Sequence, residues 1–178
     1  VVPPGSGLAA EALTHHTLKP LCTYLGLHLE GVAMDGAGML PAGLDEVARK
    51  GLIRGVYLQP NVINPLAVMM PAERRAELVE VARRHDLAII ENDILNVMIP
   101  DRAPAIAALA PERTLHICGF TKITVPGLRM AYLHAPPRHA TAVSNRHLVA
   151  NWMATPPMAD LLSHWVGNGT VAELAAWQ

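Results

Sequence analysis

Short apolar runs alternate with stretches of helical periodicity along most of this chain. Four runs have the length and composition of buried strands, and they are residues 27–34, 55–58, 87–90 and 115–118. Between them, apolar residues recur at helical spacing over residues 17–25, 40–50 and 71–85. Strands that alternate with helices in this way predict an α/β fold of three layers, α/β/α, with a mostly parallel sheet and right-handed crossovers.

The best-marked helix begins at Pro71, a residue suited to the first position of a helix. One apolar face is predicted for it, and that face consists of Ala72, Ala76, Leu78, Val79 and Ala82. The charged residues of the same helix are predicted to lie elsewhere, and they are Arg74, Arg75, Glu80 and Arg83. A strand is predicted over residues 130–135, and helices over 138–152 and 157–166, the second ending near Gly169. No element is predicted for the loose, proline-rich residues 1–8.

The composition fits one globular domain without a nucleic-acid or membrane surface of its own. The 178 residues are 51% hydrophobic, which is enough to bury a sizeable core. The 14 basic residues are balanced by 15 acidic ones, so no basic field would attract DNA or RNA. No apolar run is long enough to span a bilayer, and Cys22 and Cys118 lack metal-ligand spacing. We therefore expect a reduced, cytoplasmic protein without a metal site.

Three polar segments follow three of the predicted strands, and they are residues 59–65, 91–93 and 119–122. In open α/β sheets ligands bind beyond the carboxyl ends of the strands, so these segments are predicted to converge on one site. An amine, a carboxylate, an amide and an arginine in one pocket would suit a small anionic ligand that carries an aldehyde and a ring nitrogen. Pyridoxal 5'-phosphate is such a ligand.

Lys122 supplies the amine of this predicted site. It follows an apolar strand, and a turn at Pro126 and Gly127 separates it from Arg129. A lysine held against apolar surroundings has a lowered pKa, because burial disfavours the ammonium form, and its neutral amine can then attack an aldehyde. By spacing alone, however, an ordinary surface lysine at a strand end is the more frequent explanation.

The segment GFTKITVPGLRMAYLHAP, residues 119–136, resembles the S-x-S-K-x-x-x-P-G-x-R-x-G-Y segment of fold-type-I enzymes that depend on pyridoxal phosphate (PLP). Within the aminotransferase class I/II branch it is most similar to the aminotransferase-like domain of MocR-type regulators of the GntR family. The resemblance implies the large-domain fold of PLP-dependent transferases, with Lys122 as the Schiff-base lysine. It also implies that Thr121 and Arg129 bind the cofactor phosphate. Gly119 stands where the family has a phosphate-binding serine.

Two further segments carry the same resemblance. Asp93, the last residue of an acidic triplet after a strand, matches the carboxylate that pairs with the pyridine nitrogen of PLP. Asn64, in the segment NVINPLAV, matches the asparagine of N-P-T-G and would donate a hydrogen bond to the ring oxygen. From the residues alone, a solvated loop aspartate and an Asn-Pro turn are the simpler explanations. Leu95 stands near the usual place of a ring-oxygen tyrosine, which argues against normal transamination.

The resemblance extends over residues 8–177 and implies that residues 1–178 are a PLP-binding large domain. The N-terminal part and the C-terminal small domain of the family are expected outside it. We expect a domain that acts on or senses amino acids or amines, within a GntR/MocR-type transcriptional regulator whose DNA-binding domain lies upstream. The alternatives are a stand-alone PLP-dependent aminotransferase and a folded domain that has lost its site. Because two subunits share each active site in the family, we expect a homodimer, and little transaminase turnover from this chain alone.

Overall fold

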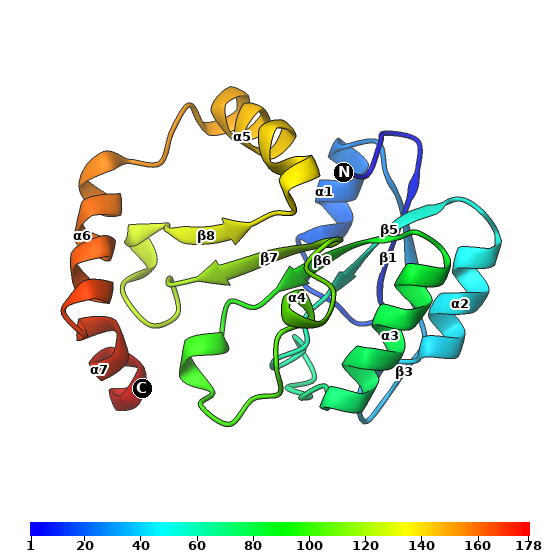
Figure 1. Cartoon of the computed structure of the whole chain (residues 1–178), viewed down its shortest axis with the longest axis horizontal. Helices are drawn as coiled ribbons and strands as arrows, with labels where there is room; N and C mark the ends of the chain where they lie inside the picture. Colours follow the sequence, from blue (N-terminus) through cyan, green and yellow to red (C-terminus); the bar gives the residue numbers. More distant parts are fainter.

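A six-stranded sheet organises the computed structural model, which describes all residues from Val1 to Gln178. Its strands are β1 (Gly7–Glu11), β2 (His28–Val32), β5 (Ile53–Leu58), β6 (Ala88–Asn92), β7 (Thr114–Gly119) and β8 (Ala131–His134). They lie in the order β2-β1-β5-β6-β7-β8 (Figure 1). The first five of these strands are parallel to one another, whereas β8 pairs with β7 in the antiparallel direction. The predicted α/β fold with a mostly parallel sheet is confirmed.

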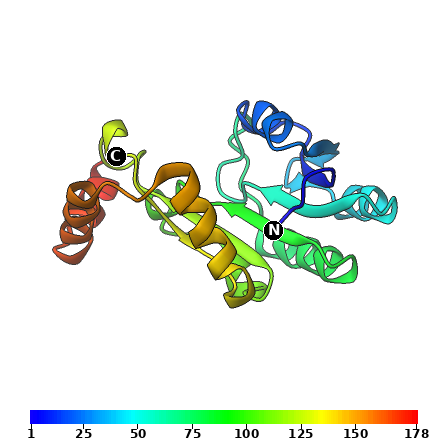
Figure 2. The same cartoon turned by 90° about the horizontal axis from the view of Figure 1, so that it is seen from above.

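Helices cover both faces of the sheet. On one face lie α2 (Pro41–Arg49), α3 (Ala72–Arg84) and α4 (Ile106–Leu109), and on the other lies α1 (Leu18–Tyr24). The view from above shows α1 and α3 on opposite sides of the strands (Figure 2). The remaining elements are the hairpin of β3 (Met34–Asp35) and β4 (Gly38–Met39), the short turns η1 (Asn96–Met98) and η2 (Pro126–Leu128), and the helices α5 (Pro137–Asn151), α6 (Pro156–Gly167) and α7 (Thr170–Trp177). None of the helices combines the length and the apolar character needed to cross a bilayer.

Strand β1 illustrates how the core is divided between the two faces. Side chains alternate along a strand, so Ala9 packs with the cluster under α2 and α3, whereas Leu8 and Ala10 pack with α1. All five residues of β1 are buried, as expected for a central strand of a parallel sheet covered on both sides. The core is therefore continuous through the first four strands of the sheet.

The C-terminal helices attach to the molecule through a separate, smaller cluster. Phe120, Ile123 and Leu128, from the segment after β7, pack against Leu162 of α6 and Val171 of α7. No residue of α5 is buried, and every residue of β8 is exposed. The segment that carries Lys122 thus packs against α6 and α7 and not against the main core.

The elements β1, α4 and α7 and the β3–β4 hairpin are absent from the predictions. The opening residues are predicted to lack structure, but Gly7–Glu11 forms β1, a central strand. Its sequence GLAAE contains no β-branched or aromatic residue, so local composition gives little sign of a strand. The helix α7 is likewise absent from the prediction; it follows Gly169, whose φ of 89° lies in the left-handed region that favours glycine.

Candidate functional site

The three polar segments meet at the carboxyl edge of the sheet, where they surround a cavity of about 250 Å³. Its lining residues are Gln59, Asn61, Val62, Ile63, Asn64, Pro65, Ala67, Asn92, Ile94, Leu95 and Lys122. They come from the loop after β5, from the segment after β6 and from the segment after β7. The predicted convergence beyond the carboxyl ends of the strands is therefore found in the structure.

Lys122 reaches the rim of this cavity from a tight turn after β7. The N–H groups of Ile123 and Thr124 donate to the carbonyl of Phe120, and the Thr124 hydroxyl donates to the same carbonyl. Phe120 and Ile123 are buried by this turn, which leaves the Lys122 side chain exposed. The amine is therefore accessible, but the apolar enclosure expected for it is not found.

Asn64 faces the cavity from the loop after β5. Ile63 is completely buried and anchors the loop, and its carbonyl accepts a hydrogen bond from the N–H of Ala67. Val62 and Ala67 adopt left-handed backbone angles, with φ of 56° and 55°. Asn64 stays exposed in this compact turn and lines the same cavity as Lys122. The predicted role of Asn64 toward a ring oxygen stays a prediction.

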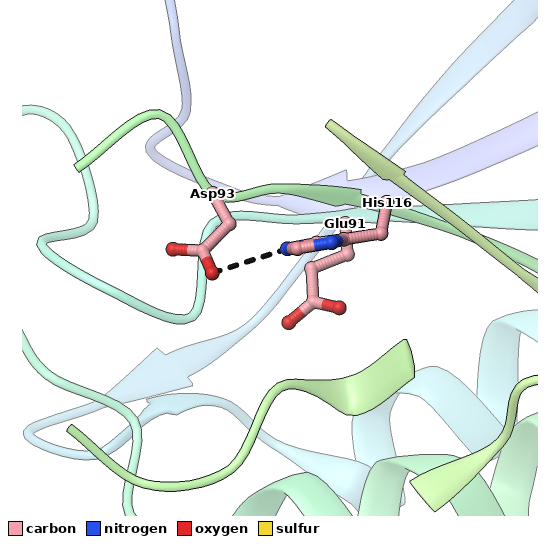
Figure 3. Close-up of side chains that lie close together, drawn as sticks. All are labelled: Glu91, Asp93 and His116. Atoms are coloured by element: carbon pink, nitrogen blue, oxygen red, sulfur yellow. Dashed lines mark hydrogen bonds and ion pairs between the residues drawn. The ribbon is translucent and has the colours of Figure 1, made fainter. Parts of the chain in front are cut away.

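Asn92 and Asp93 point in different directions at the end of β6. Asn92 lines the cavity, and its amide nitrogen donates to the Tyr57 hydroxyl at 2.5 Å. Asp93 does not line the cavity and is almost completely buried. Its carboxylate accepts a hydrogen bond from Asn61 Nδ2 at 2.7 Å. It also accepts one from His116 Nε2 at 3.2 Å (Figure 3). The hydrogen bond with Asp93 raises the pKa of His116 above its ordinary value.

The prediction for Arg75 is wrong. Arg75 was expected to lie outside the buried face of α3, but it is completely buried. Its guanidinium donates to Asn61 Oδ1 at 2.7 Å and to four backbone carbonyls, those of Pro60, Met70, Ala103 and Pro104. A buried arginine is tolerated when its donors are satisfied in this way. Arg75, Asn61, Asp93 and His116 form a continuous chain of hydrogen bonds behind the cavity, which we call the buried network.

Glu91, Asp93 and His116 form a close group of ionisable side chains (Figure 3). One carboxylate oxygen from each acid and one ring nitrogen of His116 lie within 4.8 Å of one another, close enough to be considered as metal ligands. The Glu91 carboxylate accepts the N–H groups of Ile106 and Ala107, both at 2.8 Å. Each carboxylate of the group is therefore already engaged by donors of the protein. The group therefore has a structural role: the hydrogen bonds of Glu91 connect β6 to the start of α4.

The two predicted phosphate ligands lie outside the cavity lining. Thr121 is half-buried, and Arg129 is exposed with a left-handed backbone (φ 50°). Gly119 is buried against Ile94: a Cβ built on it would lie 3.0 Å from Ile94 Cγ2 and 3.2 Å from Ile94 Cβ. The close approach of the two segments explains why glycine occupies the position where the family has serine. The phosphate roles of Thr121 and Arg129 stay predictions.

Glu11, at the end of β1, is a residue whose burial the sequence did not reveal. Burial raises its pKa from 4.5 to about 7, although its Oε1 accepts the N–H of Gln59 at 3.2 Å. The other oxygen, Oε2, is buried without a hydrogen-bond partner. Asn92 is a second residue that the prediction missed, because the sequence predicts Asp93 and not Asn92 for the site. Side-chain alternation along β6 puts position 92 on the face opposite Glu91, and that pattern could have singled it out.

No family model matches the chain. In sequence it is similar to the uncharacterized HTH-type transcriptional regulator YdeF of Bacillus subtilis, with 26% identity over 92% of this chain and 35% of that protein. It is also similar to the L-tyrosine:2-oxoglutarate aminotransferase amt1 of Serpula lacrymans, with 28% identity over 74% of this chain and 31% of that protein. The chain thus spans about a third of the length of the curated relatives that it matches.

Comparison with solved structures identifies the fold. The α-aminoadipate aminotransferase LysN of Thermus thermophilus, in complex with N-(5'-phosphopyridoxyl)-L-leucine, superposes with a TM-score of 0.86 at 22% identity, over 98% of this chain and 46% of that one. The fold is that of the PLP-dependent aminotransferases. The homologues in sequence are both HTH-type regulators and aminotransferases, so the predicted resemblance to the aminotransferase-like domain of MocR-type regulators is confirmed.

Proposed function

We propose that this chain is the PLP-binding large domain of a GntR/MocR-type transcriptional regulator, in which it senses an amino acid or amine. The observation that carries the proposal is the meeting of Lys122, Asn64 and Asn92 at one cavity beyond the carboxyl ends of parallel strands. The regulator relative supports this whole-protein role. A cytoplasmic location would suit such a role, and in the family the partner would be a second copy of the chain.

The polar groups of the cavity fit pyridoxal phosphate in type. PLP, when bound, supplies an aldehyde that condenses with an amine and a ring that withdraws electrons. Lys122 is an accessible amine that could hold the aldehyde carbon covalently, with release of water. Asn64 and Asn92 could orient the ring by hydrogen bonds, and Ile94 and Val62 provide apolar contact. Thr121 and Arg129 remain the proposed ligands of the phosphate.

Aminotransferase activity is the second candidate, and the aminotransferase among the relatives favours it. Both candidates require the covalent link at Lys122, but only the second requires turnover of an amino donor. A panel of amino donors with 2-oxoglutarate would separate them. Turnover at ordinary aminotransferase rates, about 1–10³ per second, would decide for the enzyme and against the sensor.

The chain has three lysines, Lys19, Lys50 and Lys122, which makes the covalent link easy to locate. The protein is incubated with pyridoxal phosphate, reduced with borohydride and digested, and the peptides are analysed by mass spectrometry. We expect the pyridoxyl mass on Lys122. Lys122→Ala should lose it, whereas the exposed Lys50→Ala should keep it. An adduct that persists in Lys122→Ala, or that lies on Lys19 or Lys50 instead, would contradict the proposal.

A further inference from the structure

The cavity beside Lys122 is lined by amides and contains no carboxylate. Its polar lining consists of Gln59, Asn61, Asn64, Asn92 and Lys122. Three acidic residues bond to a lining residue or neighbour one in sequence, but all three are buried and absent from the lining: Glu11, Glu91 and Asp93. The charge available to a ligand in this cavity is therefore that of a single lysine.

Asp93 cannot turn into the cavity without breaking the buried network. Its two hydrogen bonds, from Asn61 and His116, would be lost, and both donors are at least partly buried. A buried donor left without an acceptor destabilises the fold, because it loses its hydrogen bonds to water without a replacement. Asn61 is itself fixed by Arg75, which is anchored to four backbone carbonyls. The orientation of Asp93 is thus set by contacts with β7, through His116, and with α3, through Asn61 and Arg75.

Asn92 is held toward the cavity by the alternation of side chains along β6. Glu91 lies on the side of α4, where it accepts the N–H groups of Ile106 and Ala107. Ile90 packs on the opposite side, with the cluster of α1, and Asn92 follows it there. Its amide nitrogen is tied to the hydroxyl of Tyr57, a buried residue of β5. Strand alternation and the hydrogen bond to Tyr57 together orient the amide of Asn92 toward the cavity.

We infer that Asn92, and not Asp93, meets the ring nitrogen of PLP in this cavity, and that the site therefore retains an amine without removing its Cα proton. This inference rests on the proposed binding of PLP at Lys122. A carboxylate opposite the ring nitrogen keeps the ring protonated, so that the ring draws electrons from the bound amine. An asparagine side chain can donate or accept a hydrogen bond but does not hold an ionic proton at neutral pH. The device suits a receptor of amino acids that leaves its ligand unchanged.

The test compares Asn92→Asp with Asn92→Ala, Asp93→Asn and the unchanged protein, each reduced with borohydride to verify the adduct at Lys122. Each protein with PLP is then incubated with a panel of L-amino acids in deuterium oxide, and NMR follows the loss of the Cα proton. We expect exchange in Asn92→Asp to be faster than in the unchanged protein by about tenfold or more, whereas Asn92→Ala, which removes the amide without adding a carboxylate, should show no such gain. The pH dependence of the absorbance of bound PLP should change in Asn92→Asp and not in Asp93→Asn.

Thermal unfolding without PLP gives a readout of the geometry alone. Asp93→Asn should lower the Tm, because it weakens the buried network, and Asn92→Asp should lower it less. The inference is overturned if the unchanged protein exchanges as fast as Asn92→Asp. It is also overturned if Asp93→Asn alters the absorbance of bound PLP while Asn92→Asp does not. If the unchanged protein forms no adduct at Lys122, the proposed function fails first and this inference fails with it.

Discussion

Glu11 sits at the end of a central strand with one carboxylate oxygen unpaired. Burial raises its pKa from 4.5 to about 7. Because the folded pKa lies above the unfolded one, the protonated carboxyl stabilises the fold fully below about pH 4.5. This contribution is lost as the pH rises through about 7, and its size is on the order of 3 kcal/mol. Glu11→Gln keeps the shape of the side chain and cannot ionise, so it should be more stable than the original protein at pH 8 and similar to it near pH 4.5.

Urea unfolding at several pH values measures this difference. Glu46→Gln serves as the matched control, because Glu46 is an exposed acid on α2 without a hydrogen-bond partner. The control should leave the difference between pH 4.5 and pH 8 unchanged. A Glu11→Gln protein with the same pH dependence as the original would mean that Glu11 is solvated or paired in solution.

Single residues show where sequence-based reasoning succeeded and where it stopped. The position of Lys122 at the cavity followed from its place after a strand, because topology alone brings such residues together. The burial of Arg75 could not be predicted, since its acceptors are the carbonyls of loops distant in sequence, at Pro60 and Ala103. At the end of β6, strand alternation and the buried network decide that Asn92 and not Asp93 lines the cavity. The sequence of the triplet Glu91-Asn92-Asp93 does not reveal the hydrogen bonds that fix these two side chains.

The segments after β6 and β7 touch where Gly119 lies against Ile94. A side chain at position 119 would overlap Ile94, and overpacking of this kind typically costs about 1–3 kcal/mol. Gly119→Ser should therefore lower the free energy of unfolding by that amount. The combination of Gly119→Ser with Ile94→Ala should recover most of the loss, because the smaller side chain makes room.

A double-mutant cycle from urea unfolding measures the coupling between the two positions. Gly127→Ser is the control, since a Cβ at Gly127 meets nothing within 4 Å and its φ is not positive. If the two substitutions at 119 and 94 are simply additive, the contact between the segments does not explain the glycine.

Whole elements were predictable where the apolar pattern was regular. The helix α3 and the strand β7 lie within two residues of their predicted ranges, because each carries a clear periodicity. The strand β1 was not predicted: Ala9 and Ala10 are buried only because strands and helices from elsewhere cover them. Tertiary packing overrides local propensity at such positions.

An exposed apolar surface distinguishes one side of the whole molecule. It is formed by β8, by α5 and by the two residues that follow α5, and its residues are Tyr132, Leu133, Leu148, Val149, Trp152 and Met153. A groove lined by residues of both elements runs between them. Surfaces of this kind commonly mark sites of association. Since the resemblance implies a homodimer, this β8–α5 surface is the part of the chain that we expect to meet the second copy.

Replacement of Val149 and Trp152 by glutamate should weaken the expected homodimer, because its formation would remove the new charges from water. The two side chains are 81% and 71% exposed, so the fold of each monomer should survive. Analytical ultracentrifugation over a range of concentrations measures the change, and we expect dissociation at a concentration at least about tenfold higher. Leu52→Glu is the control, at a residue 63% exposed outside this surface. Unchanged association of the double variant would place the interface elsewhere.

At this scale the sequence predicted most, since alternating strands and helices define both the layers and the edge where a ligand can bind. It could not predict the exposure of β8 and α5, because an apolar residue looks the same in sequence whether a core or a partner covers it.

The position of β1 also has a consequence for the growing chain on the ribosome. Residues Gly7–Glu11 are translated before both neighbours, yet they lie between β2 and β5. Until Leu58 has left the exit tunnel, one side of β1 carries unpaired N–H and C=O groups beside apolar side chains. Such nascent segments are prone to aggregate or to depend on chaperones. Slow decoding of codons before Leu58 would prolong that exposure and lower the yield of folded protein without changing a single amino acid.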